Sequence, residues 1–270
     1  MKINTIVSLV FVATGFLSCK DSAKPETVPT YELVWSDEFD QAEIQIDTSK
    51  WFLETEAPNN GAWYNNELQH YTDRLDNVYV SDGTLKIVAK KEDYTHSGTT
   101  QAYTSSRLNS RFKFTYGRVE VRAKLPRAQG TWPAIWMLGE NLTTAGWPAC
   151  GEIDIMEQLF EDFLMVQCAI HVPASYGDTP VLKQFNVSDV TENFHVYGVE
   201  WTPKELRFFV DDTFYFTYAP EDKNDANWPF YRNQFILLNI AMGGNLGGTV
   251  APDFTQDAME VDFVRVYQKK

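Results

Sequence analysis

The sequence predicts an all-β protein built from many short strands. Apolar and polar residues alternate with a period of two in residues 85–90 and 119–125, which is typical of half-buried strands. Breaks rich in Gly, Pro and Asn recur along the chain, and no long segment keeps an apolar stripe at the helical period. In a chain of this length the pattern predicts a two-sheet sandwich or a barrel with antiparallel connections.

A β-hairpin is predicted in the C-terminal third of the chain. Residues 206–210 and 213–218 are rich in aromatic and β-branched residues, and they flank Asp211 and Asp212. Two acidic residues between such runs favour a tight turn.

The N-terminus has the pattern of an export signal. Lys2 precedes an uncharged apolar run over residues 3–18, shorter than the roughly 20 residues that span a bilayer, so residues 1–18 are predicted to be a signal peptide. Cys19 follows Phe-Leu-Ser, as in a bacterial lipobox in which the Cys is lipidated; an ordinary signal peptide with an incidental Cys is the alternative. Residues 19–30 offer little that packs and predict a lipidated tether. We expect an exported protein, lipid-anchored in the bacterial outer membrane or at the cell surface.

Residues 31–270 are predicted to form one domain, because no Pro-, Ser- or Gly-rich linker divides them; two small domains are the alternative. The formal net charge of −14 argues against nucleic acid or an anionic membrane surface as the ligand and favours a neutral one. Contact with a membrane is expected only through the lipid. Cys150 and Cys168 are too few for a disulfide scaffold and unlike a zinc site; they either pair or remain separate buried thiols.

The segment GEIDIMEQ, residues 151–158, contains three carboxylates: Glu152, Asp154 and Glu157. On a regular strand Glu152 and Asp154 would share one face and Glu157 would point away. Two carboxylates on one face repel each other, so folding alone does not favour them. A solvated edge strand is the simple alternative to a functional site.

The apolar residues between the acids argue against that alternative. Ile153, Ile155 and Met156 predict a core-facing side, which leaves the acids on the floor of a cleft. A β-bulge, with Met156 or Ile155 as the extra residue, would shift the alternation by one and bring Glu157 to the side of Glu152.

Two carboxylates that converge to about 5–5.5 Å suit a retaining glycosidase, in which one is the nucleophile and the other the acid and then the base. Asp154, recessed between two glutamates, would hydrogen-bond the nucleophile and help to hold a shared proton. The order of the residues alone does not say which glutamate attacks.

Motifs spread over most of the chain resemble glycoside hydrolase family 16, in particular its laminarinase-like members. They are GTWPAIWML at 130–138, WPAC at 147–150 before the acidic strand, LVWSDEF at 33–39, NNELQ at 65–69, YGR at 116–118, FHVY at 194–197 and VDFVRVY at 261–267. The resemblance implies a β-jelly roll sandwich of two antiparallel sheets with an open concave substrate cleft. It also implies retaining endo-hydrolysis of β-1,3-glucosidic linkages in laminarin-like β-glucan by a monomer that needs no cofactor for catalysis. Glu152 would be the nucleophile, Glu157 the acid/base and Asp154 the assisting carboxylate.

Aromatic residues near the acidic strand are candidates for stacking on the flat faces of sugars. Trp132 and Trp136 are four residues apart and fit one strand face, and Trp147 and Trp63 extend the set. Trp is costly to expose unless an amphipathic partner covers it. A core position is the alternative for each of them.

Polar candidates follow from the resemblance and from the expected pairing of strands. Asn66, Glu67 and Arg107 resemble the polar substrate contacts of the family. His171 lies on the strand expected beside the acidic one, where it either faces the carboxylates or is structural.

A structural calcium ion is implied by the resemblance alone, with Glu38, the carbonyl of Gly83 and Asp262 as its ligands. Oxygen ligands from distant segments suit Ca²⁺ and would join the ends of the domain. Three residues depart from the family pattern: Tyr64, His70 and Leu246 stand where Gly, Tyr and Trp are common. All three fall in expected cleft loops, so they leave the linkage preference open.

Other functions remain open at this point. The same chemistry would serve a mixed-linkage β-1,3/1,4-glucanase, a related galactan hydrolase or a transglycosylase. A non-catalytic surface glycan-binding lipoprotein would use the same fold, but it would gain nothing from three clustered like charges.

Overall fold

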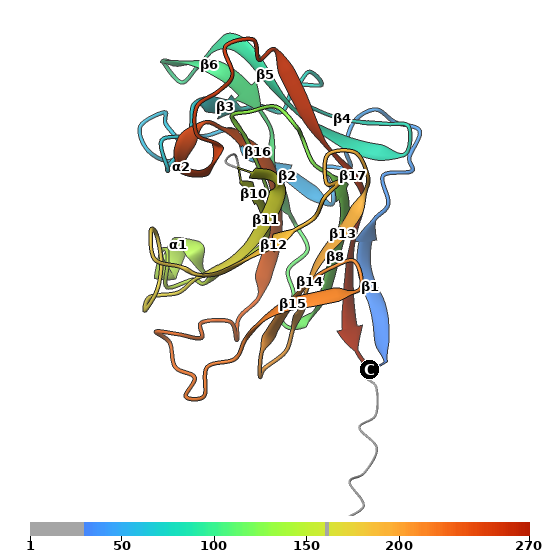
Figure 1. Ribbon diagram of the computed structural model, residues 1–270, viewed down its shortest axis with the longest axis vertical. Coiled ribbons are helices and arrows are strands. Elements are labelled where there is room, and N and C mark those ends of the chain that lie inside the picture. Colours follow the sequence, from blue (N-terminus) through green and yellow to red (C-terminus); the bar gives the residue numbers. More distant parts are fainter. Residues whose placement is uncertain (1–29, 160–161) are drawn as a thin grey trace, which may run out of the picture.

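Two stacked β-sheets form the part of the chain that the computed structural model describes, residues 30–159 and 162–270 (Figure 1). The predicted all-β two-sheet sandwich is confirmed. The predicted signal peptide, Cys19 and the tether up to residue 29 lie outside the described residues. Among the described residues, no helix has the length and apolar character needed to cross a membrane.

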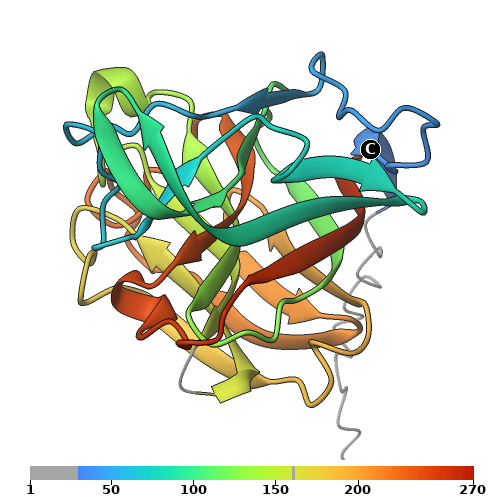
Figure 2. The same ribbon diagram turned by 90° about the horizontal axis from the view of Figure 1, so that it is seen from above.

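The larger sheet has ten strands. Its hydrogen-bonded order is β15 (Thr213–Tyr218), β14 (Leu206–Val210), β13 (His195–Trp201), β8 (Gly117–Lys124), β17 (Gln256–Lys269), β5 (Thr84–His96), β6 (Thr99–Ser105) and β3 (Gln69–Tyr71). Two further strands join at the sides, β1 (Tyr31–Asp37) on β17 and β4 (Val78–Ser81) on β5. Seen from above, β5 and β17 lie side by side (Figure 2).

The smaller sheet has seven strands and holds the acidic segment near its middle. Its order is β12 (Val181–Asn186), β11 (Asp162–His171), β10 (Glu152–Leu159), β9 (Thr131–Gly139), β16 (Gln234–Met242), β7 (Arg107–Ser110) and β2 (Trp51–Leu53). Two short helices, α1 (Leu142–Ala145) and α2 (Gly244–Gly247), lie in the connections after β9 and β16.

The strand and the hairpin that the sequence patterns predict are present in the structure. In β8 every second residue is buried, and β14 and β15 pair around the turn at Asp211 and Asp212. One pairing differs from the expectation of two antiparallel sheets, because β3 runs parallel to β6. β3 is only three residues long and reaches β6 through loops rather than through a hairpin, so a tight turn does not fix its direction.

The hydrophobic core fills the space between the two sheets. Ile153, Ile155 and Met156 of β10 face it, together with Val121 of β8 and Tyr197 of β13 from the opposite sheet. Cys150 and Cys168 are both buried, and both are free thiols. The apolar residues of β10 therefore fix that strand to the core and leave its other face for the carboxylates.

Candidate active site

A β-bulge interrupts β10 between Asp154 and Glu157. The pairing register shifts by one residue against both neighbours, β9 and β11. On β9, consecutive residues pair with Asp154 and Met156, so Ile155 is the extra residue. Ile155 and Met156 both point into the core, which returns Glu157 to the face occupied by Glu152 and Asp154. The predicted bulge is confirmed.

Glu157 is buried and is held by two hydrogen-bond donors. Trp132 Nε1 donates to its Oε1 at 3.0 Å, and Gln167 Nε2 donates to its Oε2 at 3.0 Å. Glu157 is only 8% exposed. Burial raises the pKa of Glu157, and the two hydrogen bonds oppose that rise because they favour the ionised form.

Glu152, at the start of β10, is more accessible than Glu157. Trp147 Nε1 donates to Glu152 Oε2 at 2.6 Å, and His171 Nε2 lies 4.0 Å from Oε1. Burial and the charge of Asp154 raise the pKa of Glu152 well above its ordinary value, against the opposing effects of His171 and the Trp147 hydrogen bond. Glu152 is thus partly exposed, with the Trp147 and His171 side chains near its carboxylate.

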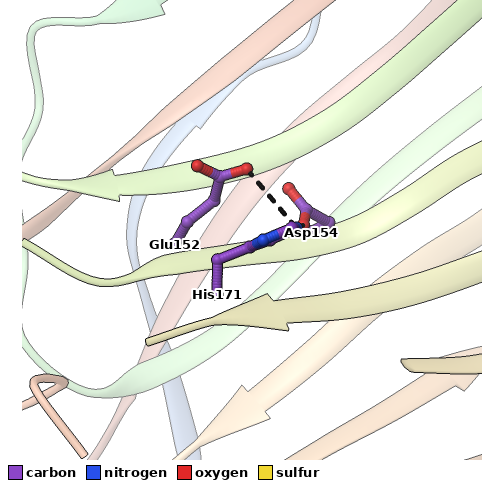
Figure 3. A group of neighbouring side chains, drawn as sticks. All are labelled: Glu152, Asp154 and His171. Carbon is purple, nitrogen blue, oxygen red and sulfur yellow. Dashed lines mark ion pairs between the residues drawn. The ribbon is translucent and has the colours of Figure 1, made fainter. Parts of the chain in front are cut away.

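Asp154 lies between the two glutamates and is 3% exposed. His171 Nε2 is 3.4 Å from its Oδ2, and Figure 3 shows both acids of this end of β10 turned toward the imidazole. Burial and the charge of Glu157 raise the pKa of Asp154 well above its ordinary value, while a hydrogen bond with Glu152 acts in the opposite sense. The cluster cannot hold three negative charges at once, so it retains protons that exposed acids would lose.

The orientation of His171 follows from its other ring nitrogen. His171 pairs with Glu152 across β10 and β11, as the sequence predicted for this neighbouring strand. The amide N–H of Gly177 donates to His171 Nδ1 at 3.2 Å. The proton of the neutral imidazole then lies on Nε2, the nitrogen that faces the carboxylates; this tautomer is assigned from the hydrogen bonds.

Glu152, Asp154 and His171 could together hold a metal ion, because one potential ligand atom from each lies within 4.8 Å of those of the other two. A cation at this position would compete with the protons that the carboxylates share.

A hydrogen-bond chain fixes Trp136 on the other side of the catalytic strand. Trp136 Nε1 donates to Asn239 Oδ1 at 2.8 Å, and Asn239 Nδ2 donates to the hydroxyl of Tyr71 at 3.0 Å. Tyr71 in turn donates to Glu67 Oε2 at 3.3 Å, and Gln69 Nε2 donates to the same oxygen at 2.7 Å. Burial raises the pKa of Glu67, against these hydrogen bonds.

Arg107 lies beside two of the predicted tryptophans. Its guanidinium carbon is 4.7 Å from the ring centroid of Trp136 and 5.4 Å from that of Trp63, and its Nε forms an ion pair with Glu54 at 2.9 Å. Trp136 is partly exposed, whereas Trp63 is buried. The arginine therefore holds the indole of Trp136 in place from one face.

The predicted stacking residues separate into two kinds. Trp132 and Trp63 are buried, so neither offers an open ring face, and Trp132 instead positions Glu157. Trp147 is 44% exposed and Trp136 partly so. Asn66 is exposed, and its Nδ2 donates to Asn245 Oδ1 at 3.1 Å, which joins the loop before β3 to the loop after β16.

Two of the three residues predicted to bind calcium, Glu38 and Asp262, are engaged by arginine side chains. Arg265 holds Glu38 through both carboxylate oxygens and lowers its pKa, and Arg122 forms an ion pair with Asp262 at 2.6 Å. Gly83 lies in the turn between β4 and β5. A calcium ion would have to displace two guanidinium groups, so the side chains as placed do not fit the ion, and calcium binding stays a prediction.

Several residues of the site were absent from the prediction: Gln167, Tyr71, Gln69, Asn239 and Tyr176. A signal was present for two of them, because Gln167 and Asn239 are amides with apolar residues on both sides in their strands. A buried amide needs hydrogen-bond partners and therefore marks a polar network.

Comparison with known proteins places the chain in a family and finds similar proteins of solved structure. The family model "Glycosyl hydrolases family 16" matches residues 65–265. The beta-glucanase of Rhodothermus marinus is 40% identical over 275 residues, which cover 96% of this chain and 93% of that protein.

Solved structures are similar over nearly their whole length. A LamA variant from Zobellia galactanivorans, in complex with laminaritriose and laminaritetraose, is 47% identical with a TM-score of 0.81, covering 87% of this chain and 98% of that one. The laminarinase from Rhodothermus marinus is 40% identical with a TM-score of 0.82, covering 90% of this chain and 99% of that one.

A β-sandwich whose bulged strand places two glutamates and an aspartate on one face defines a carboxylate-dependent glycoside hydrolase. The chain belongs to glycosyl hydrolase family 16.

Proposed function

We propose that this protein is an endo-acting, retaining β-1,3-glucanase that cleaves laminarin-like glucan. The bulge at Ile155 is the observation that carries the proposal, because it places Glu157 on the same face as Glu152. The laminarinases and the beta-glucanase that the chain resembles support β-glucan as the substrate.

Glu152 acts as the nucleophile in this proposal. Its carboxylate is approachable, and the Trp147 indole and the His171 imidazole stabilise the negative charge that attack requires. Its oxygen bonds to the anomeric carbon as the glycosidic C–O bond breaks.

Glu157 acts as the acid and then as the base. Burial keeps it protonated at a pH where an exposed glutamate would be ionised, so it donates its proton to the departing glycosidic oxygen. It then removes a proton from water, which attacks the anomeric carbon and releases Glu152. Trp132 and Gln167 hold its carboxylate still through both steps.

Asp154 holds a proton between the two glutamates. Burial and the charge of Glu157 raise its pKa, so it retains a proton at a pH where an exposed aspartate would be ionised. As Glu152 loses its charge in forming the glycosyl-enzyme bond, the repulsion within the cluster falls.

Chemical rescue with azide tests the two roles. With an aryl β-glucoside as substrate, Glu152→Ala leaves space for azide on the nucleophile's side, and the expected product is the α-glycosyl azide. In Glu157→Ala the glycosyl-enzyme still forms, and azide attacks from the opposite face to give the β-glycosyl azide. NMR of the products distinguishes them, and exchanged anomers would reverse the assignment.

A panel of laminarin, mixed-linkage glucan, agarose and carrageenan tests the substrate. We expect internal cleavage of laminarin, seen as a rapid fall in polymer size relative to the release of reducing ends. Cleavage of agarose or carrageenan alone would indicate a galactan hydrolase. Laminarin that binds but is not cleaved would support the glycan-binding alternative.

We also propose that residues 1–18 direct export and that lipidated Cys19 anchors a monomeric enzyme in the outer membrane or at the cell surface. The pattern of the N-terminal sequence supports this part of the proposal. Replacing Cys19 by Ser should release the protein from the membrane fraction; retention there would contradict lipidation.

A further inference from the structure

We propose that Tyr176, together with Trp147, forms an additional glucosyl-binding subsite on the β11 side of Glu152. The inference rests on the proposed function, because the occupant is a further glucose unit of the same β-glucan chain. It assigns to the loop after β11 a part in substrate binding.

Two exposed aromatic rings meet at right angles beside the catalytic cluster. Tyr176 is 47% exposed and Trp147 is 44% exposed. Their ring centroids are 5.4 Å apart with an interplanar angle of 86°. Exposed apolar side chains that are gathered at one place, rather than scattered singly, are typical of a binding surface.

The corner formed by the rings of Tyr176 and Trp147 adjoins the catalytic cluster. The ring centroid of Trp147 is 5.7 Å from that of His171, and the indole N–H of Trp147 donates to Glu152 at 2.6 Å. A sugar held against Tyr176 would therefore be a close neighbour of the unit at Glu152. This continuity identifies the occupant as another unit of the bound glucan.

The loop after β11 holds Tyr176 in a fixed place. Val172 and Ser175 form an isolated β-bridge, and the amide of Ala174 donates to the carbonyl of Ala226 at 2.8 Å. Next to Tyr176, the amide of Gly177 donates to His171 at 3.2 Å. Little conformational freedom is left to lose when a ligand binds, which favours affinity.

The strand order places this corner opposite the other partly exposed indole. Tyr176 follows β11, on one side of β10, whereas Trp136 lies on β9 and Arg107 on β7, on the other side. A glucan chain that crosses the strands at Glu152 therefore meets an aromatic side chain on each side. An endo-acting enzyme needs such contacts on both sides of the bond that it cleaves.

The two rings suit a pyranose in complementary ways. The flat C–H face of the sugar packs on one ring, and the second ring, perpendicular to the first, borders its edge. Tyrosine adds a hydroxyl group that can exchange hydrogen bonds with sugar hydroxyls.

The dependence of kcat/KM on chain length tests the proposal. Laminari-oligosaccharides of increasing length are compared for the wild type, Tyr176→Ala and Tyr176→Phe, with Phe214→Ala as a matched control. Phe214 is 41% exposed on β15, in the opposite sheet. The ratio of kcat/KM between long and short oligosaccharides should fall about fivefold in Tyr176→Ala, the scale of one aromatic contact, and Tyr176→Phe should restore most of it.

Binding of the same oligosaccharides is measured by calorimetry in a Glu152→Ser background. Tyr176→Ala should weaken binding of the long oligosaccharides. Its affinity for the short ones should stay near that of the control variant. An unchanged length profile, or an equal loss at every length, would overturn the subsite and indicate a structural loop acting through His171. Failure of the wild type to cleave any laminari-oligosaccharide would instead overturn the proposed function, and the subsite with it.

Discussion

Gln167 faces Glu157 directly across the β10–β11 ladder, and its amide donates to Glu157 Oε2 at 3.0 Å. On an unbroken strand that starts from the pairing of Asp154 with Ala169, Gln167 would face Met156 instead. The bulge therefore supplies the acid/base with its hydrogen-bond donor as well as turning it toward the active site.

Replacing Gln167 by Leu should shift the pH dependence of catalysis. The hydrogen bond from Gln167 favours the ionised form of Glu157. Its loss therefore raises the pKa of Glu157 further, and the protonated acid persists to higher pH. The basic limb of the kcat/KM profile should move to higher pH. The control is Gln184→Leu at an exposed position opposite Gln167 on β12. A basic limb that stays in place would show that Gln167 is only structural.

Glu152→Ser should lower kcat by about 10³-fold or more, because a hydroxyl group without a general base does not replace the nucleophile. The fold and the binding of glucan should persist, since Glu152 is outside the hydrophobic core. Reducing-end assays and calorimetry with laminarin measure the two effects. Glu140→Ser, at an exposed position, is the control. A variant with near wild-type turnover would contradict the nucleophile assignment.

Asp154→Asn should stabilise the protein more at pH 8 than at pH 5. The pKa of Asp154 is raised in the folded state, so its contribution to stability is fully present below the ordinary value of 3.8 and is lost as the pH rises through the folded pKa. An amide removes the buried charge. We expect a gain of about 1–2 kcal/mol, or about 2–8 °C in Tm, at the higher pH.

Thermal unfolding at both pH values measures this difference, with Asp40→Asn at an exposed position as the control. Activity should fall in the Asp154 variant while stability rises. A Tm difference from the wild type that does not grow with pH would contradict a raised pKa for Asp154.

Asn239→Leu should lower the free energy of unfolding by about 1–3 kcal/mol, because it leaves Trp136 and Tyr71 without a shared partner. It should also raise KM for laminarin, since the indole of Trp136 loses its orientation. Urea unfolding and steady-state kinetics measure both effects, with Asn193→Leu at an exposed position as the control. An unchanged KM would remove Trp136 from the substrate site.

The sequence was a good guide wherever a short local pattern determines the structure. Alternation in residues 119–125 predicted β8, and the acidic pair at Asp211 and Asp212 predicted the hairpin of β14 and β15. The bulge was predictable because the spacing of Glu152 and Glu157 conflicts with the strand period unless one residue is inserted.

The sequence was a poorer guide to side chains whose role depends on several strands together. Trp132 and Trp147 are both tryptophans near the acidic strand, yet one is buried against Glu157 and the other is exposed beside Glu152. Local alternation says which face of a strand a residue occupies, but it does not say what covers that face.

By itself the sequence determined that the chain is all-β and that Glu152, Asp154 and Glu157 share one face of a bulged strand, because periodicity and charge act over a few neighbouring residues. The choice of a sandwich over a barrel came from the family resemblance. Only the tertiary structure decided which groups surround those carboxylates. Gln167, His171 and Tyr176 reach the site from another strand and its loop, and their effects on protonation and binding depend on distances that arise when the strands pair.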